Sequence, residues 1–363
     1  MRKLATIRKV TNIRPIEGKD LIEQVNVDGW NVIVKKDEFK EGDLCVYIEI
    51  DSKLPARPEF EFLAKKDYTI KTMKMAGVRS EGIVFPLSIL PKKVKVVEGA
   101  DVTKVLGVEQ YNKETEEEVS FLDKLIDAID TKMRKFAWYR KLTIKSKRSV
   151  KKSSSFPNWI KKTDEERIQN KPKVLTLRKT WLATEKLDGS SATYGYRNVG
   201  GVEEYVICSR NKRITDETEV WAVIDKKYGL EKIIKDLFVT LGAQESLVIQ
   251  GEIIGPKIQG NKYKLTEPKF FMFNLIIDGI KVNYYNVYEK VLHLIPVVPV
   301  FDVFHINGDT SVDDILNIAT FKSHINEDTL AEGLVFRAFD EETGAVIDSF
   351  KAVSPQFLIS NKE

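Results

Sequence analysis

The chain has 363 residues, of which 42% are hydrophobic and 31% charged, a composition typical of a soluble protein with room for two domains. No apolar run approaches the ~20 residues that cross a bilayer, and the start from Met1 to Ile7 carries charge too early for a signal peptide. We therefore expect a cytosolic or nuclear protein without a membrane partner. Cys45 and Cys208 lie far apart in apolar runs, which favours buried thiols over a disulfide or a zinc pair.

Positive charge is unevenly distributed, although the net charge is only +4. The stretch 132–162 is rich in lysine and arginine and contains no acid. A run of this kind is typical of a solvated face or linker. It would equally suit a segment that contacts a polyanion, with Trp138 and Tyr139 available to stack on bases, and both interpretations stay open.

Residues 1–110 are predicted to form a small β-barrel of the OB type. Short strands are expected over 22–27, 30–34, 44–50, 68–72 and 82–86. Short strands with frequent turns, such as Asp28-Gly29, favour a barrel or sandwich over a parallel sheet. The residues that would make this module bind nucleic acid are Lys35, Lys36, Arg57, Lys71, Lys74 and Arg79. A packing module with ordinary surface lysines is the alternative, because a fold does not prove a function.

Residues 111–155 are predicted to form a charged helical connector. Acids over 114–118 precede an apolar series at helical spacing over 119–129, and the basic stretch follows. Acids that lead and bases that trail suit the dipole of a helix. The run Ser153-Ser154-Ser155 predicts a flexible boundary with the next domain.

Residues 156–363 are predicted to form an α+β domain in which antiparallel sheets alternate with helices. Strands are expected on the approach to Lys186 and over 205–210, 247–254, 269–277, 282–284, 333–339 and 345–351. Helices are expected over 164–170, 217–228, 230–241, 287–292, 312–318 and 355–360.

The stretch Glu185-Lys186-Leu187-Asp188-Gly189 carries the clearest chemical signal. Its apolar approach places Lys186 at the end of a strand, where burial would lower the pKa of the amine and make it a nucleophile. Asp188 would share a face with Lys186, and Gly189 would permit a close backbone approach or a positive φ. Taken alone, the stretch also fits a surface hairpin turn.

Five later segments add weight to the lysine: Ser209-Arg210-Asn211, Gln250-Gly251-Glu252, the aromatic run 270–274, Glu332 to Arg337, and Ser349-Phe350-Lys351. Together with the lysine stretch, in this order, they resemble motifs I, Ia, III, IIIa, IV and V of the covalent nucleotidyltransferases, which include polynucleotide ligases and capping enzymes. The N-terminal module, and the short tail after Lys351, are similar to ATP-dependent RNA ligases whose OB domain precedes an adenylyltransferase (ATP-grasp-like ligase) domain.

The resemblance implies that Lys186 attacks the α-phosphorus of ATP and forms a lysyl-AMP, from which AMP passes to an RNA 5′-phosphate. It implies Mg²⁺ or Mn²⁺ beside Asp188, Glu252 and Glu332, and Lys351 on the phosphate. It further implies that the nucleotide is contacted by Glu185, Lys186, Gly189, Arg210, Glu252, Phe271, Lys351 and Arg167, with Phe271 stacked on adenine. The pattern departs at Ser349, where many ligases carry a first basic residue.

The expected function is therefore the sealing of RNA 3′-OH and 5′-phosphate ends, with a nicked duplex as the expected partner and the OB module on its minor groove. A DNA ligase, a guanylyltransferase and a non-catalytic RNA-binding protein with the same fold are the alternatives. The histidines, His293, His305 and His324, match no motif and are expected to be structural.

Overall fold

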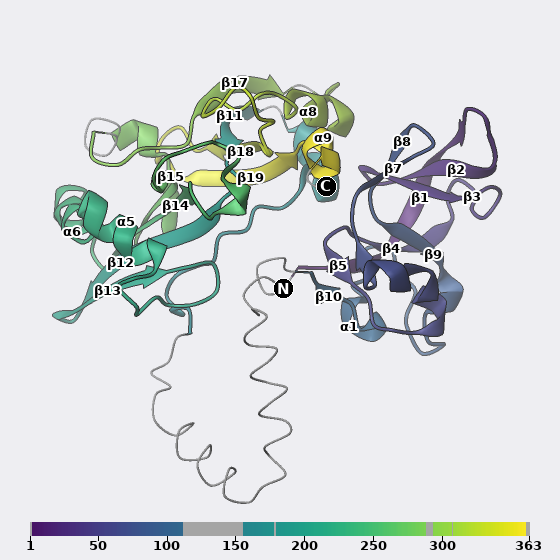
Figure 1. The fold of residues 1–363 in the computed structure, drawn as a ribbon, viewed down its shortest axis with the longest axis horizontal. Coiled ribbons are helices and arrows are strands. Elements are labelled where there is room, and N and C mark those ends of the chain that lie inside the picture. Colours follow the sequence, from purple (N-terminus) through teal and green to yellow (C-terminus); the bar gives the residue numbers. More distant parts are fainter. Residues whose placement is uncertain (1, 112–154, 178, 288–292, 307, 361–363) are drawn as a thin grey trace, which may run out of the picture. The chain divides into compact units, whose positions relative to one another are not determined.

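The computed structural model describes residues 2–111, 155–177, 179–287, 293–306 and 308–360 (Figure 1). The chain divides into two compact units, Met1–Lys152 and Ser153–Glu363. Residues 112–154, which make up nearly all of the predicted connector over 111–155 and most of the basic stretch, lie outside the described residues, so the connector stays a prediction. No helix in the described ranges is long and apolar enough to cross a membrane.

The N-terminal unit is an OB-type barrel built from antiparallel strands. Its five-stranded sheet has the order β3 (Trp30–Lys35), β2 (Lys19–Val27), β1 (Ala5–Ile16), β4 (Leu44–Ile48) and β9 (Ile83–Pro86). A three-stranded sheet contains β10 (Glu109–Gln110), β5 (Ser52–Lys53) and β6 (Thr69–Ile70), and β7 (Met73–Met75) pairs with β8 (Val78–Ser80). Over residues 2–111, its helical segments are the 3₁₀ helices Pro58–Lys66 and Leu87–Ile89 and the short α1 (Thr103–Leu106).

The longest barrel strand, β1, is one that the sequence did not predict. Its first five residues pair with β4 and its later residues pair with β2, with a register shift between Val10 and Asn12. One strand that serves two partners in this way bends the sheet and helps to close a barrel. The strand was missed because its sequence mixes Arg8, Lys9 and Pro15 with its apolar residues, which obscures the alternation.

The second unit contains two antiparallel sheets. The four-stranded sheet has the order β17 (Val300–Ile306), β11 (Lys179–Lys186), β18 (Gly333–Phe339) and β19 (Val346–Val353). The five-stranded sheet has the order β13 (Val202–Cys208), β12 (Ser190–Val199), β14 (Ser246–Ile254), β15 (Lys269–Ile277) and β16 (Ile280–Val282). Among the described residues of this unit, the α-helices are α5 (Val220–Tyr228), α6 (Leu230–Thr240), α8 (Val312–Ile318) and α9 (Pro355–Ser360), and 3₁₀ helices span Ile168–Asn170, Pro172–Thr176, Gln259–Asn261 and Tyr284–Val287.

Each sheet has its own apolar core. Helices α5 and α6 lie along the five-stranded sheet (Figure 1), and Ile224, Ile234 and Leu237 pack there against the side chains of β12, β14 and β15. In the four-stranded sheet, Trp181 and Phe350 pack together with α8, their ring centroids 4.9 Å apart. This α+β architecture confirms the predicted fold class. Both cysteines are buried, also as predicted.

The predicted helix over 164–170 is wrong apart from the 3₁₀ turn Ile168–Asn170. Residues 156–167, which we call the strap, are mostly irregular, and Phe156, Trp159 and Ile160 pack on the five-stranded sheet. Charged residues of the strap form hydrogen bonds with both sheets, so these tertiary contacts outweigh the local helical tendency. Strands β12 and β17 were not predicted, and most of the predicted helix 287–292 lies outside the described residues.

Candidate active site

Lys186 is the last residue of β11, where the chain crosses from one sheet to the other. Strand β11 pairs with β17 and β18, whereas β12 begins at Ser190 and pairs with β13 and β14. Leu187, Asp188 and Gly189 make this crossing. The stretch is therefore not the surface hairpin turn that its sequence alone also fitted.

Glycines next to the three site acids allow the backbone to approach closely. A Cβ on Gly189 would collide with the carbonyl oxygen of Ile253, and Gly189 does not have a positive φ. Gly251, before Glu252, and Gly333, after Glu332, have equally little room. The acids are thus held at points where two backbones meet, a closeness that a larger residue would not permit.

The ammonium of Lys186 donates a hydrogen bond to Glu332 at 2.6 Å (Nζ to Oε2). Burial lowers the pKa of Lys186, but the charges of Glu332, Glu252 and Asp188 outweigh burial and raise it. Desolvation thus acts in the predicted direction, but the predicted net lowering of the Lys186 pKa is wrong, because the three carboxylates outweigh it. The lysine is charged here and needs to lose a proton before it can attack.

Glu252 comes from β14, opposite Ser191 of β12. Burial, and then the charges of Glu332 and Asp188, raise the pKa of Glu252 to about 8, while Lys186 and Arg210 act in the opposite direction. Arg210 itself is exposed just beyond β13. These mutual effects show that the carboxylates and Lys186 form one electrostatic cluster although their sequence positions span almost 150 residues.

Asp188 is held by two residues that the sequence analysis missed. Its carboxylate forms an ion pair with Lys262, and its backbone N–H donates to the Tyr263 hydroxyl at 2.8 Å. The ammonium of Lys262 also lies 4.3 Å from the ring centroid of Phe357 in α9. Lys262 and Tyr263 belong to the loop between β14 and β15, where the sequence carries no motif that could have indicated them.

Glu185 faces away from Lys186, as neighbouring residues of a strand do. Its fully buried carboxylate accepts hydrogen bonds from the Ser323 hydroxyl at 2.5 Å and from the His324 backbone N–H at 2.9 Å. Burial raises the pKa of Glu185, and these hydrogen bonds oppose the rise. The His324 ring lies 3.3 Å from the same carboxylate, so this histidine belongs to the immediate surroundings of the lysine stretch.

Lys351 lies on β19, and its ammonium donates to Asp164 of the strap at 3.0 Å. Its backbone N–H donates to the carbonyl of Glu166, and Arg167 pairs with Lys351 in a parallel bridge and is buried. The charge of Lys351 acts on Glu332, which places the second lysine in the same cluster.

Phe271 of β15 lies opposite Glu252 in the sheet and packs with Leu187 and Tyr263. The structure thus brings together Lys186, Asp188, Glu252, Glu332 and Lys351, with Arg210 and Phe271 beside them. The side chain of Glu185 is directed elsewhere, and Arg167 is buried beside the Lys351 backbone.

Residues 179–353 match the family model of RNA ligases, and residues 4–87 match a model of an OB-fold domain. Solved structures of the Naegleria gruberi RNA ligase are similar over both chains. Its complex with PPi has 29% identity and a TM-score of 0.78, covering 99% of this chain and 98% of that one. A glutamate-to-alanine variant with AMP and Mn has 28% identity and a TM-score of 0.78, covering 98% of each chain. A lysine-to-alanine variant with ATP and Mn has 28% identity and a TM-score of 0.79, covering 99% and 98%. No curated protein sequence matches the chain.

A strand that ends in Lys186 beside three carboxylates, in a domain of two antiparallel sheets, defines a covalent nucleotidyltransferase. Within that class the chain belongs to the RNA ligase family, in the branch with an N-terminal OB domain.

Proposed function

We propose that this RNA ligase uses ATP to join 3′-OH and 5′-phosphate RNA ends, and that its substrate is a nick in a duplex. The observation that carries the proposal is Lys186 at the end of β11, hydrogen-bonded to Glu332 within a cluster that also includes Glu252 and Lys351. A mere binding protein has no need for a lysine that is surrounded by three acids. The similar Naegleria gruberi RNA ligase has been solved with ATP, AMP and PPi, which agrees with this chemistry.

The reaction has three transfers. First, the neutral amine of Lys186 attacks the α-phosphorus of ATP, so that a P–N bond forms and pyrophosphate leaves. Second, an oxygen of the RNA 5′-phosphate attacks the lysyl-AMP and regenerates Lys186. Third, the RNA 3′-hydroxyl loses its proton and attacks the activated 5′-phosphate, and AMP leaves. Glu332 already accepts a hydrogen bond from Lys186, so it is positioned to receive the proton that the first step requires.

The acids Asp188, Glu252 and Glu332 would hold a hydrated divalent ion, Mg²⁺ or Mn²⁺. Within the part of the chain that the structure describes, no three acids, histidines or cysteines form a group that could bind a metal directly. The fit instead comes from electrostatics, because the acids raise the pKa of Glu252 and a cation would relieve their repulsion. When bound, the ion supplies positive charge beside the phosphate, and oxygen ligands with retained waters suit Mg²⁺.

The remaining site residues are proposed to bind and orient the nucleotide. Phe271 would stack on adenine, Arg210 would contact the ribose or phosphate, and Lys351 would stabilise charge on the α-phosphate. Arg167 is proposed to support the phosphate side of the site. Glu185 and Gly189 would contribute main-chain contacts, since the Glu185 carboxylate is bonded to Ser323 and His324.

The OB unit is proposed to bind the RNA. Five of its six predicted contact residues are exposed: Lys35, Lys36, Arg57, Lys71 and Lys74. The sixth, Arg79, forms an ion pair with Glu81 at 2.9 Å. Exposed cations suit phosphate binding, and contacts to 2′-hydroxyls across the minor groove would separate RNA from DNA.

The direct test is covalent labelling. Incubation with ATP labelled at the α-phosphate and Mg²⁺ should label the protein, and Lys186→Ala should abolish the label while the protein remains folded. Sealing of a nicked RNA duplex should disappear in the same variant. A wild-type protein that stays unlabelled with ATP would refute the proposal, label from GTP alone would identify a guanylyltransferase, and equal sealing with a deoxyribose 3′ end would favour a DNA ligase.

A further inference from the structure

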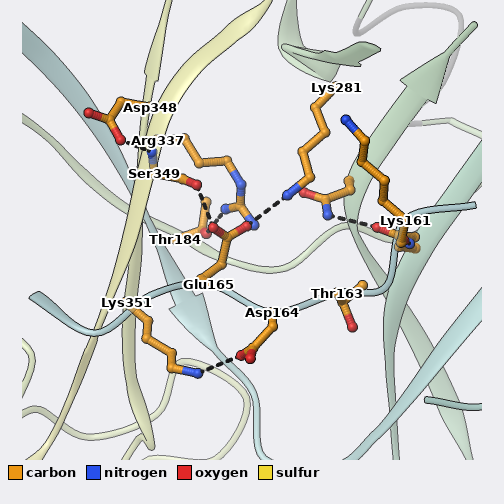
Figure 2. A network of polar contacts seen from close by, with 12 residues as sticks. Lys161, Thr163, Asp164, Glu165, Thr184, Lys281, Arg337, Asp348, Ser349 and Lys351 are labelled. Atoms are coloured by element: carbon orange, nitrogen blue, oxygen red, sulfur yellow. Dashed lines mark hydrogen bonds and ion pairs between the residues drawn. The ribbon is translucent and has the colours of Figure 1, made fainter. Parts of the chain in front are cut away.

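The strap crosses from one sheet of the second unit to the other (Figure 2). On the five-stranded sheet, the Gln250 side chain donates to the Lys161 carbonyl at 2.8 Å, and the hydroxyls of Thr163 and Ser191 lie 3.1 Å apart. On the four-stranded sheet, the backbone N–H of Lys351 donates to the Glu166 carbonyl at 2.8 Å. The strap therefore joins the two sheets in addition to the chain crossing after Lys186.

Glu165 lies at the centre of this junction. One carboxylate oxygen accepts from Lys281 at 3.0 Å, and the other accepts from the Ser349 hydroxyl, as Figure 2 shows. Lys281 belongs to β16 in the five-stranded sheet, and Ser349 belongs to β19 in the four-stranded sheet. A single carboxylate thus binds both sheets. The Glu165 side chain is 15% exposed and that of Lys281 is 27% exposed, so this ion pair is much better shielded than a surface pair.

The charges around Glu165 keep it ionised. Burial raises its pKa, but the charges of Arg337 and Lys281, together with hydrogen bonds from Ser349 and Lys281, outweigh burial and hold the pKa below its ordinary value. Arg337 lies opposite Ser349 on β18. A shielded, ionised carboxylate is costly to leave without hydrogen-bond partners, so it holds the groups that donate to it in place.

Ser349 is two residues from Lys351 on the same strand, so both side chains lie on one face of β19. We propose that Glu165 is a positioning residue for Lys351, which ties β19 to β16 and so fixes Lys351 relative to Glu252 of the opposite sheet. The inference rests on the proposed function, in which Lys351 acts on the α-phosphate. It also gives Ser349 a role at the position where many ligases carry a basic residue, because its hydroxyl donates to Glu165, whereas a lysine there could not replace the tie that Lys281 makes from the other sheet.

The test measures the rate of lysyl-AMP formation in single turnovers with full-length protein. Glu165→Gln and Lys281→Met should each lower the rate at saturating ATP by roughly tenfold or more, because a small displacement of a group that acts on the transition state is costly. The ATP concentration for half-maximal rate should change less than about threefold, since ground-state contacts to the nucleotide remain. Lys281→Arg should keep most of the rate.

A double-variant comparison shows whether Glu165 and Lys281 act through one shared contact between the sheets or affect the rate independently. The double variant Glu165→Gln/Lys281→Met should be no slower than the slower single variant, because the second change removes a partner that is already lost. Adding Ser349→Lys to Lys281→Met should not restore the rate, since the new lysine belongs to the same sheet as Lys351. A matched control is Lys226→Met, which removes an exposed pair with Glu217 and should leave the rate unchanged.

Wild-type rates in both single variants, multiplied losses in the double variant, or restoration by Ser349→Lys would each overturn the inference. A wild-type protein without any lysyl-AMP would instead overturn the proposed function. Circular dichroism and thermal unfolding identify a variant that fails to fold. If Glu165→Gln fails to fold, the rates of Lys281→Met and of its Ser349→Lys derivative decide the question, because Lys281 is partly exposed and its loss is better tolerated.

Discussion

Replacing Glu252 with glutamine should make the metal-free protein more stable above neutral pH. The wild-type carboxyl has a pKa of about 8 in the folded chain, against an ordinary 4.5, because it is largely shielded from solvent and lies near the charges of Glu332 and Asp188. A group whose pKa rises on folding contributes its full stability below its unfolded pKa and loses it as the pH rises through its folded pKa. The stability of the wild type should therefore fall, relative to the variant, between about pH 4.5 and 8.

The size of this stability difference follows from the pKa shift of Glu252. One pKa unit corresponds to ~1.4 kcal/mol, so the shift to about 8 sets an upper limit near ~5 kcal/mol. Glu252 is partly exposed, and solvent screening reduces the expected difference between pH 5 and 8.5 to about 2 kcal/mol. Urea unfolding in EDTA at several pH values measures it, with Glu217→Gln as the exposed control. Parallel stability curves for the wild type and Glu252→Gln would refute the reasoning.

Three further variants test the geometry of the site. Gly189→Ala should lower the free energy of unfolding by about 2 kcal/mol or more, since its Cβ would meet the Ile253 carbonyl, whereas Gly308→Ala, with open space around it, should not. Lys262→Met should tighten Mn²⁺ binding severalfold in a paramagnetic resonance titration, because Asp188 loses its competing ammonium; unchanged or weaker binding would contradict this. Lys351→Ala should slow lysyl-AMP formation roughly a hundredfold with little change in half-saturating ATP, and a change in half-saturation alone would assign Lys351 to ground-state binding.

The sequence predicted best the elements whose pattern is local. Strands β15 and β18 and helices α8 and α9 have the predicted bounds, because each is a compact apolar or capped segment, as with the Ser311 cap of α8. The site residues could be proposed because their order along the chain resembles a known set of motifs. Their order did not reveal that Lys186 would be charged, which depends on how closely Glu332 and Glu252 approach it.

What the sequence could not indicate lies mainly in contacts between distant elements. Lys262 and Tyr263 reach Asp188 from a loop without a motif, and Glu165 reaches Lys281 across 116 positions. The strap has the composition of a short helix, but its contacts with the five-stranded and the four-stranded sheet hold it in an irregular conformation. Such residues are determined by packing partners that no local window contains.

The buried hydrogen bonds of Glu185 affect how Lys186, the proposed nucleophile, is placed. Neighbouring residues of a strand point to opposite faces, so a slip of β11 by one position would exchange a lysine for a carboxylate beside Glu332. The hydrogen bonds from Ser323 and His324 require the register of β11 in which Glu185 occupies its present position. Glu185 therefore helps to fix the register of β11, and this register directs the side chain of the next residue, Lys186, toward Glu332.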